Sequence, residues 1–256
     1  MPFLSELLIS EVFAFFLIFV RMGAALMAMP GFGEVFISAR SRLFIALSIS
    51  LAATPFLSPH IPPVPDQMGL LFLLIVKEAM AGAFIGTLVR VLTSAVHSAG
   101  TILAVQSGLA NALFFDFTQS GQTTAVSNML TFTALVLMFV SDLHLVLIMG
   151  IIDSYNFMPV NKGPAIGDMA YIAANYLNEA FTMGLKLSSP FVTMSLISNT
   201  GAGVLARLMP NFQVFFVMMG PQIWITFLIL SISLSTVMLV YLDYLEAGLH
   251  SLLVAL

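Results

Sequence analysis

Long apolar stretches with almost no charge constrain this chain more than any other feature of its sequence. The stretch 125–152 contains one charged residue, Asp142, and the stretch 204–244 contains two, Arg207 and Asp243. A helix needs about 20 apolar residues to cross the hydrocarbon core of a bilayer, so both stretches are long enough. Only 8% of all residues are charged, against about 25% in soluble domains. The sequence therefore predicts an all-α integral membrane protein.

Six long hydrophobic segments are expected along the chain. Their boundaries come from charged residues and from prolines and glycines, which end helices by removing a backbone donor or by freeing the backbone to turn. Pro30 and Gly31 are expected to end the first segment. Residues 198–203 should separate the last two, and Gly220 and Pro221 should form a turn that opens the final long helix. The six segments span residues 7–29, 43–57, 69–97, 125–152, 169–197 and 204–244.

Charged side chains inside these segments are unfavourable, because inserting an ionised group at the bilayer centre costs about 2.5–3.5 kcal/mol of free energy. Lys77 and Glu78 are adjacent, so on a helix their side chains point about 100° apart and cannot neutralise each other. Arg21 and Arg90 are long enough to reach a membrane interface. We expect pairing between helices or between subunits, with a proton or ion path as the alternative. The charged residues concerned are Arg21, Lys77, Glu78, Arg90, Asp142, Glu179 and Lys186.

Patterns for catalysis and metal binding are missing from the sequence. The chain has no cysteine, which excludes disulfides, thiolate metal sites and cysteine nucleophiles. It also has no GxSxG nucleophile elbow and no GxxxxGK[ST] phosphate loop. Asp142 and His144 lie close together in one segment, but no further metal ligand is near them. We therefore expect no enzyme activity, no cofactor and no metal. The net charge of −4 gives no basic surface for nucleic acid.

A phenylalanine-rich stretch, residues 108–121 (GLANALFFDFTQSG), interrupts the hydrophobic pattern. Phe114, Phe115 and Phe117 lie beside Asp116 and between two glycines, in a stretch too polar to span a membrane well. One interpretation is an amphipathic connector whose rings pack on neighbouring helices. The other is a plug, because aromatic rings that project into a water-filled passage can close it by dewetting. The residues alone favour the connector.

Three parts of the chain, in order, are similar to one known family. They are RMGAALMAMPGFGEVFISARSRLFIALSIS at 21–50, QSGLANALFFDFTQSGQTTAVSNML at 106–130 and RLMPNFQVFFVMMGPQIWITFLIL at 207–230. The last part holds Asn211 and Phe215 before a Gly-Pro pair. In length, order and spacing these parts resemble the FliR/SctT family of type III secretion export-gate proteins over essentially the whole chain.

The resemblance implies a pore-forming structural subunit of the flagellar type III export gate, not an enzyme. Such a subunit would form one membrane domain, 1–256, whose kinked helices pack within a helical hetero-oligomer in the bacterial inner membrane, at the flagellar basal body. The implied partners are FliP and FliQ, with FlhB, FlhA and membrane lipid, and the implied substrates are unfolded flagellar proteins. The resemblance also implies that Phe114, Phe115 and Phe117 act as the plug.

Two other functions stay open at the level of sequence. The homologous subunit of a virulence injectisome would share these motifs. A stand-alone proton-coupled transporter would instead use Glu78, Asp142 or Glu179 as a proton relay. A defined complex with two other small membrane proteins would favour the export gate over the transporter.

Overall fold

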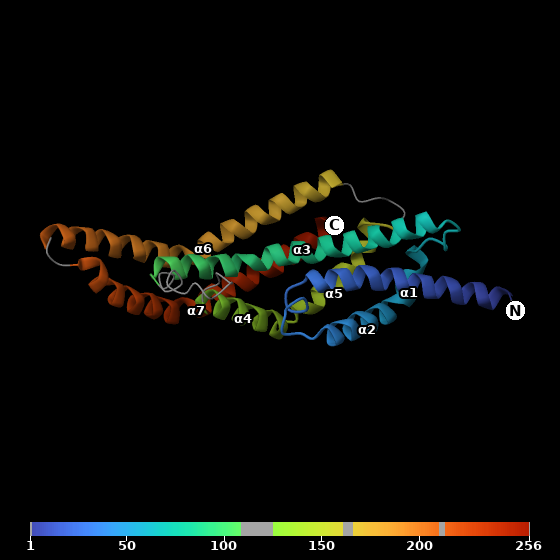
Figure 1. Cartoon of the computed structure of the whole chain (residues 1–256), viewed down its shortest axis with the longest axis horizontal. Helices are drawn as coiled ribbons and strands as arrows, with labels where there is room; N and C mark the ends of the chain where they lie inside the picture. The colour runs from blue at the N-terminus through green and yellow to red at the C-terminus, as the bar shows by residue number, and fades with distance from the viewer. Residues whose placement is uncertain (1, 109–124, 161–165, 210–212, 256) are drawn as a thin grey trace. The chain divides into compact units, whose positions relative to one another are not determined.

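The protein is described by a computed structural model that covers residues 2–108, 125–160, 166–209 and 213–255 (Figure 1). Within these ranges the regular structure is helical throughout, without a strand. In chain order the helices are α1 (Pro2–Ala28), α2 (Ala39–Leu57), the short 3-10 helix η1 (Ser58–His60), α3 (Met68–Gln106), α4 (Ala125–Val140), α5 (Leu143–Phe157), α6 (Ile166–Leu208) and α7 (Val214–Ala255).

These helices confirm the all-α integral membrane class. In the described part of the chain five helices are long and apolar enough to cross a bilayer, and α4 with α5 gives a sixth span if the broken pair is counted as one. Three of the helices are longer than a span requires: α3 has 39 residues, α6 has 43 and α7 has 42. At about 1.5 Å per residue, each is roughly twice the length of a hydrocarbon core about 30 Å thick. Each must therefore tilt strongly or extend beyond the lipid.

The chain divides into two compact units. Unit 1 comprises Met1–Leu92, Ser141–Leu177 and Glu246–Leu256, and unit 2 comprises Thr93–Val140 and Asn178–Leu245. Unit 1 thus holds α1, α2, η1 and α5, together with the first parts of α3 and α6 and the C-terminal end of α7. Unit 2 holds α4, the last part of α3 and most of α6 and α7.

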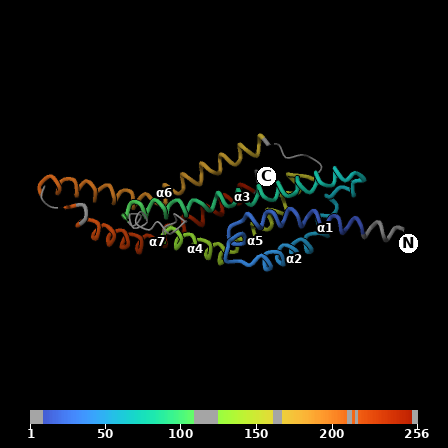
Figure 2. The backbone as a smooth tube through the Cα atoms, in the orientation of Figure 1, coloured from blue at the N-terminus to red at the C-terminus, as the bar shows by residue number. Residues whose placement is uncertain are grey.

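In unit 1, α1 and α2 lie side by side, as the backbone trace in Figure 2 shows. The turn between them begins after Ala28, and Gly31 has a φ of 86°, a left-handed conformation that glycine adopts without strain. Ser38 caps α2 by accepting a hydrogen bond from the Ser41 amide at 3.1 Å. The Arg42 guanidinium donates back to the Phe32 carbonyl at 2.9 Å, which holds the turn against the start of α2.

Small residues let α3 approach α1 closely. A Cβ atom added to Gly86 would lie 2.5 Å from the carbonyl oxygen of Ala25 and 2.6 Å from the Cβ of Ala28. Gly82 meets the backbone of Arg21 in the same way one turn earlier. Such backbone approach is typical of membrane helices, where packing rather than the hydrophobic effect drives association. It also brings the two charged side chains described below within reach of each other.

The structure differs from the expected boundaries in two helices. Gly220 and Pro221 lie inside α7 and do not form a turn, and α6 continues through residues 198–203 to Leu208. Glycine costs a helix about 1 kcal/mol, and an internal proline removes one backbone bond. In an apolar environment the remaining backbone groups have no water to bind, so a continuous helix stays the better state.

The segment expected as one helix over 125–152 is instead broken. It forms α4 and α5, separated at Ser141 and Asp142, and Asp142 has a φ of 57°. This left-handed backbone ends α4, because a helix cannot continue through it. Aspartate is one of the few side chains that tolerate this conformation. The break therefore has a local cause in one residue.

Candidate functional site

A buried ion pair joins α1 to α3 in unit 1. The Arg21 Nε donates to Glu78 Oε2 at 2.7 Å, and one terminal guanidinium nitrogen donates to Glu78 Oε1 at 2.9 Å. Each side chain is only 1% exposed. This two-bond geometry is the strongest form of an arginine–carboxylate contact. The Arg21 side chain, although long enough to reach a membrane interface, turns inward to a partner 57 residues away on another helix.

Helix α5 completes the arrangement around Arg21. The guanidinium donates to the Ser154 hydroxyl at 3.1 Å and to the Met158 carbonyl at 2.9 Å. Its central carbon lies 3.8 Å from the centre of the Tyr155 ring, a cation–π distance. The Tyr155 hydroxyl in turn donates to Glu78 Oε2 at 3.2 Å. We call these five residues the arginine cluster; they tie α1, α3 and the end of α5 together.

The arginine cluster suits a fixed structural pair better than a proton relay. The Glu78 carboxylate accepts three hydrogen bonds and faces a cation, so its charge is already compensated. The adjoining cavity, lined in part by Lys77 and Val160, has a volume of about 10 Å³. That is room for at most about one water molecule. Asp142 and Glu179, the other proposed relay acids, are exposed.

The other charged residues singled out in the sequence do not form a second cluster. Arg90 lies 3.6 Å from Glu34, and both side chains are substantially exposed. Exposed pairs of this kind contribute about 0–1 kcal/mol. Within the described residues no ion pair involves Lys77, Asp142, Glu179 or Lys186. The pairing expected for these four groups stays a prediction about partner subunits.

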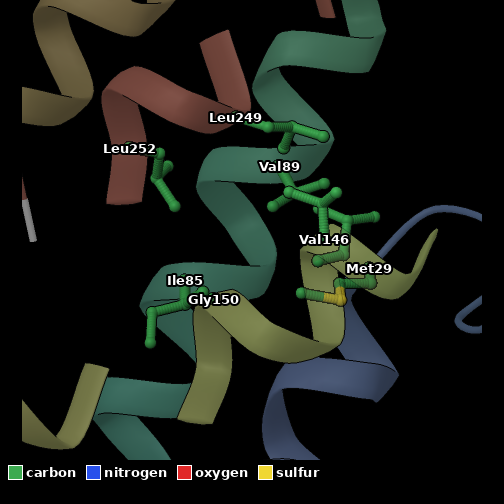
Figure 3. Close-up of a pocket in the computed structure, with 8 residues that line it drawn as sticks. Met29, Ile85, Val89, Val146, Gly150, Leu249 and Leu252 are labelled. Carbon is green, nitrogen blue, oxygen red and sulfur yellow. The ribbon is translucent and has the colours of Figure 1, made fainter. Parts of the chain in front are cut away.

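Unit 1 holds a second small cavity, lined only by apolar residues. Its volume is about 10 Å³, and α3, α5 and the end of α7 contribute to its walls. Figure 3 shows the side chains of Met29, Val89 and Val146 gathered there, with Leu249 beside Val89. An apolar space of this size has no room for a cofactor. Over the described ranges, no group of three His, Asp or Glu side chains comes close enough to bind a metal.

The Phe-rich stretch begins directly after α3. The three predicted plug residues, Phe114, Phe115 and Phe117, lie outside the described residues. The structure does describe the point where the stretch starts. Gly108 has a φ of 78°, and its amide donates to the Val105 carbonyl at 3.2 Å, which turns the backbone out of the helix.

Uncharged polar side chains meet at this end of α3, in unit 2. Gln222 Nε2 on α7 donates to the Gln106 carbonyl at 2.6 Å, and the Ser195 hydroxyl on α6 donates to Gln106 Oε1 at 2.8 Å. Asn199 Nδ2, one turn along α6, donates to the same Ser195 oxygen at 3.2 Å. Sequence reasoning missed this group, which we call the glutamine clamp. Searching the apolar helices for uncharged polar side chains as well as charges would have found its members.

Large apolar side chains are exposed on both units. Phe56 and Phe72 on unit 1 are 76% and 68% exposed, and Trp224 and Ile232 on unit 2 are 75% and 74% exposed. Monomeric soluble proteins rarely leave apolar surface of this extent uncovered. Lipid or other protein chains must cover these helices.

Comparison with known proteins gives a consistent result. Residues 12–248 match the family described as bacterial export proteins, family 1. The flagellar biosynthetic protein FliR of Caulobacter vibrioides is 32% identical over 233 residues, which is 91% of this chain and 93% of that protein. The FliR protein of Pectobacterium carotovorum is 29% identical over 82% of this chain and 80% of its own length. That of Bacillus subtilis is 28% identical over 89% and 88%.

Proposed function

Because this chain belongs to family 1 of the bacterial export proteins, the FliR family, we propose that it is a non-enzymatic, pore-forming subunit of the flagellar type III export gate. The family match and the apolar helices make the chain a membrane-embedded subunit of the flagellar export apparatus. The observation that carries the proposal is the match over residues 12–248, because it covers nearly the whole chain.

In the proposed gate the chain does not stand alone in lipid. FliP and FliQ cover part of its apolar surface, FlhB and FlhA lie next to them, and the assembly sits in the inner membrane at the flagellar basal body. The exposure of Phe56, Phe72 and Trp224 supports this arrangement, as does the length of α3, α6 and α7. Helices about twice as long as a bilayer is thick need protein cover where they leave the lipid.

The proposed substrate is unfolded flagellar protein, and the proposed plug is the trio Phe114, Phe115 and Phe117. Export of unfolded chains needs a passage and not a binding pocket, and the two cavities described above, each about 10 Å³, are too small to hold a peptide segment. A passage wide enough for a polypeptide would leak ions at rest. Rings projecting into it would expel water and stop that leak.

The test is the ion conductance of membranes that contain the assembled gate. Replacing Phe114, Phe115 and Phe117 together by alanine should leave the complex assembled and raise the resting conductance, because the passage fills with water. Replacing the same three by leucine is the matched control, since it keeps most of the apolar volume and should keep the gate tight. Unchanged conductance in an assembled alanine variant would refute the assignment of these residues as the plug.

A further inference from the structure

One face of α6 in unit 2 carries exposed polar side chains at every helical turn between residues 178 and 193. These side chains follow one another at intervals of three or four residues, the spacing that places side chains on one face of a helix. At about 1.5 Å per residue the face extends over about 22 Å. We call it the polar stripe; it consists of Asn178, Glu179, Thr182, Lys186, Ser189 and Thr193.

The opposite face of α6 packs against the rest of unit 2. Leu187 and Phe191 are each only 4% exposed. A Cβ atom added to Gly184 would lie 3.1 Å from the carbonyl oxygen of Ala95 on α3, so the two backbones approach closely there. The polar stripe is therefore turned away from the packed interior of the unit.

A third face of α6, beside the polar stripe, is apolar and also exposed. Phe181 and Leu185 are 60% and 45% exposed, and they lie on the same helical turns as Thr182 and Lys186. Bulk water around this part of α6 would leave both apolar side chains wet, which the hydrophobic effect opposes. At one level along its axis, α6 thus separates an apolar environment from a polar one.

The polar stripe has unmet needs that lipid cannot supply. Within the described residues, no hydrogen bond or ion pair involves the side chains of Asn178, Glu179 or Lys186. The exposed Pro190 also lacks the amide that would bond to the Lys186 carbonyl. Hydrocarbon leaves such groups unsatisfied. A partner helix would have to match an amide, a carboxylate and an ammonium at fixed places, whereas water satisfies all three without a matching surface.

We propose that the polar stripe lines a water-filled passage of the export gate, along which unfolded protein moves. The proposal rests on the proposed function of the chain as a pore-forming subunit. Amide and hydroxyl side chains can both donate and accept hydrogen bonds, so they exchange partners with passing peptide groups much as water does. Glu179 and Lys186 carry opposite charges and face water, not a partner subunit. The stripe keeps the passage wet without selecting a sequence.

Single cysteines report the surroundings of each face, because the chain has no cysteine of its own. The stripe variants are Asn178→Cys, Thr182→Cys, Ser189→Cys and Thr193→Cys. Phe181→Cys and Leu185→Cys are the matched controls on the apolar face of the same helix. Each is assembled into the complete gate in lipid nanodiscs and treated with a membrane-impermeant sulfonated maleimide. The complex with the unsubstituted chain gives the background labelling of the partner chains.

The stripe cysteines should react at least about tenfold faster than the two controls, because the thiolate is the reactive form and apolar surroundings suppress it. An export substrate fused to a stably folded protein should stall in the passage. It should then slow the labelling of the stripe and leave the controls unchanged. After denaturation all six variants should label equally, which checks that every thiol is intact.

The other outcomes overturn the proposal. Equal labelling of the two faces, or rapid labelling of the stripe that a stalled substrate does not slow, would mean that the stripe does not line the passage. Slow labelling together with cross-links to a partner chain would make it a contact between subunits. Failure of the four stripe variants to assemble would have the same meaning, since a face turned to water tolerates a small side chain. Export of flagellar protein that continues in cells lacking this chain would instead refute the proposed function, whatever the labelling shows.

Discussion

Replacing Glu78 by glutamine tests whether the arginine cluster stabilises the protein as a fixed pair. The substitution keeps the shape of the side chain and removes its charge. Arg21, only 1% exposed, would keep its cation and its bonds to Ser154 and Met158. Its two bonds to the carboxylate, at 2.7 and 2.9 Å, would be replaced by at most one bond to the neutral amide oxygen, and a hydrogen bond to a charged group contributes about 1.5–3 kcal/mol.

The expected cost is about 3–5 kcal/mol, the usual penalty for breaking a buried pair and leaving one charge behind. At roughly 2–4 °C per kcal/mol for a chain of this size, the midpoint of thermal unfolding should fall by about 6–20 °C. The assay is thermal unfolding of the purified complex, together with the amount of the protein in membranes.

Two further variants complete the test. Removing both charges with Arg21→Met and Glu78→Leu should recover most of the loss, because a buried pair and an apolar replacement of similar volume are close in stability. Glu34→Gln breaks the exposed pair with Arg90 and should cost at most about 1 kcal/mol. A Glu78→Gln protein as stable as the parent, or a double variant no better than the single one, would refute the reasoning.

Other substitutions test the helix contacts and the helix break. Gly86→Ala should cost about 1–3 kcal/mol, because its Cβ would lie 2.5 Å from the Ala25 carbonyl oxygen and the helices must separate; Gly23→Ala, with open space around it, should instead stabilise by up to about 1 kcal/mol. Asp142→Gly should be neutral or stabilising and Asp142→Val should cost at least about 1–2 kcal/mol, since φ is 57° there. Thermal unfolding of the purified complex measures all four, and equal midpoints for Gly86→Ala and Gly23→Ala, or for the two Asp142 variants, would contradict these assignments.

Much of the fold could be predicted because its main determinant is local. A run of apolar residues long enough to span a bilayer specifies a helix almost regardless of its tertiary context. The same local reasoning gave the end of the first helix near Pro30. It failed at Pro221, because the preference of proline for turns comes from water-soluble proteins, where a freed carbonyl can bind water. In an apolar environment the helix continues, as α7 does.

The site was only half predictable, since its pairings are not local. The cost of a buried charge indicates that Arg21 and Glu78 need partners, but nothing in the sequence selects a residue 57 positions away. The glutamine clamp was missed for a related reason. The free-energy cost of one uncharged polar residue in a membrane helix is small, so such a residue does not by itself indicate a site. Gln106, Ser195 and Gln222 form a recognisable group only in the folded structure.

During synthesis Arg21 lacks the partners that compensate its charge in the folded protein. Arg21 leaves the ribosome 57 residues before Glu78 and 133 residues before Ser154. At about 5–20 residues per second, the guanidinium waits about 3–11 s for its carboxylate and about 7–27 s for the serine. During that time a fully inserted first helix would carry an unpaired cation at about 2.5–3.5 kcal/mol. Until α3 has been synthesised, the first helix is therefore less stable in the bilayer by about that amount.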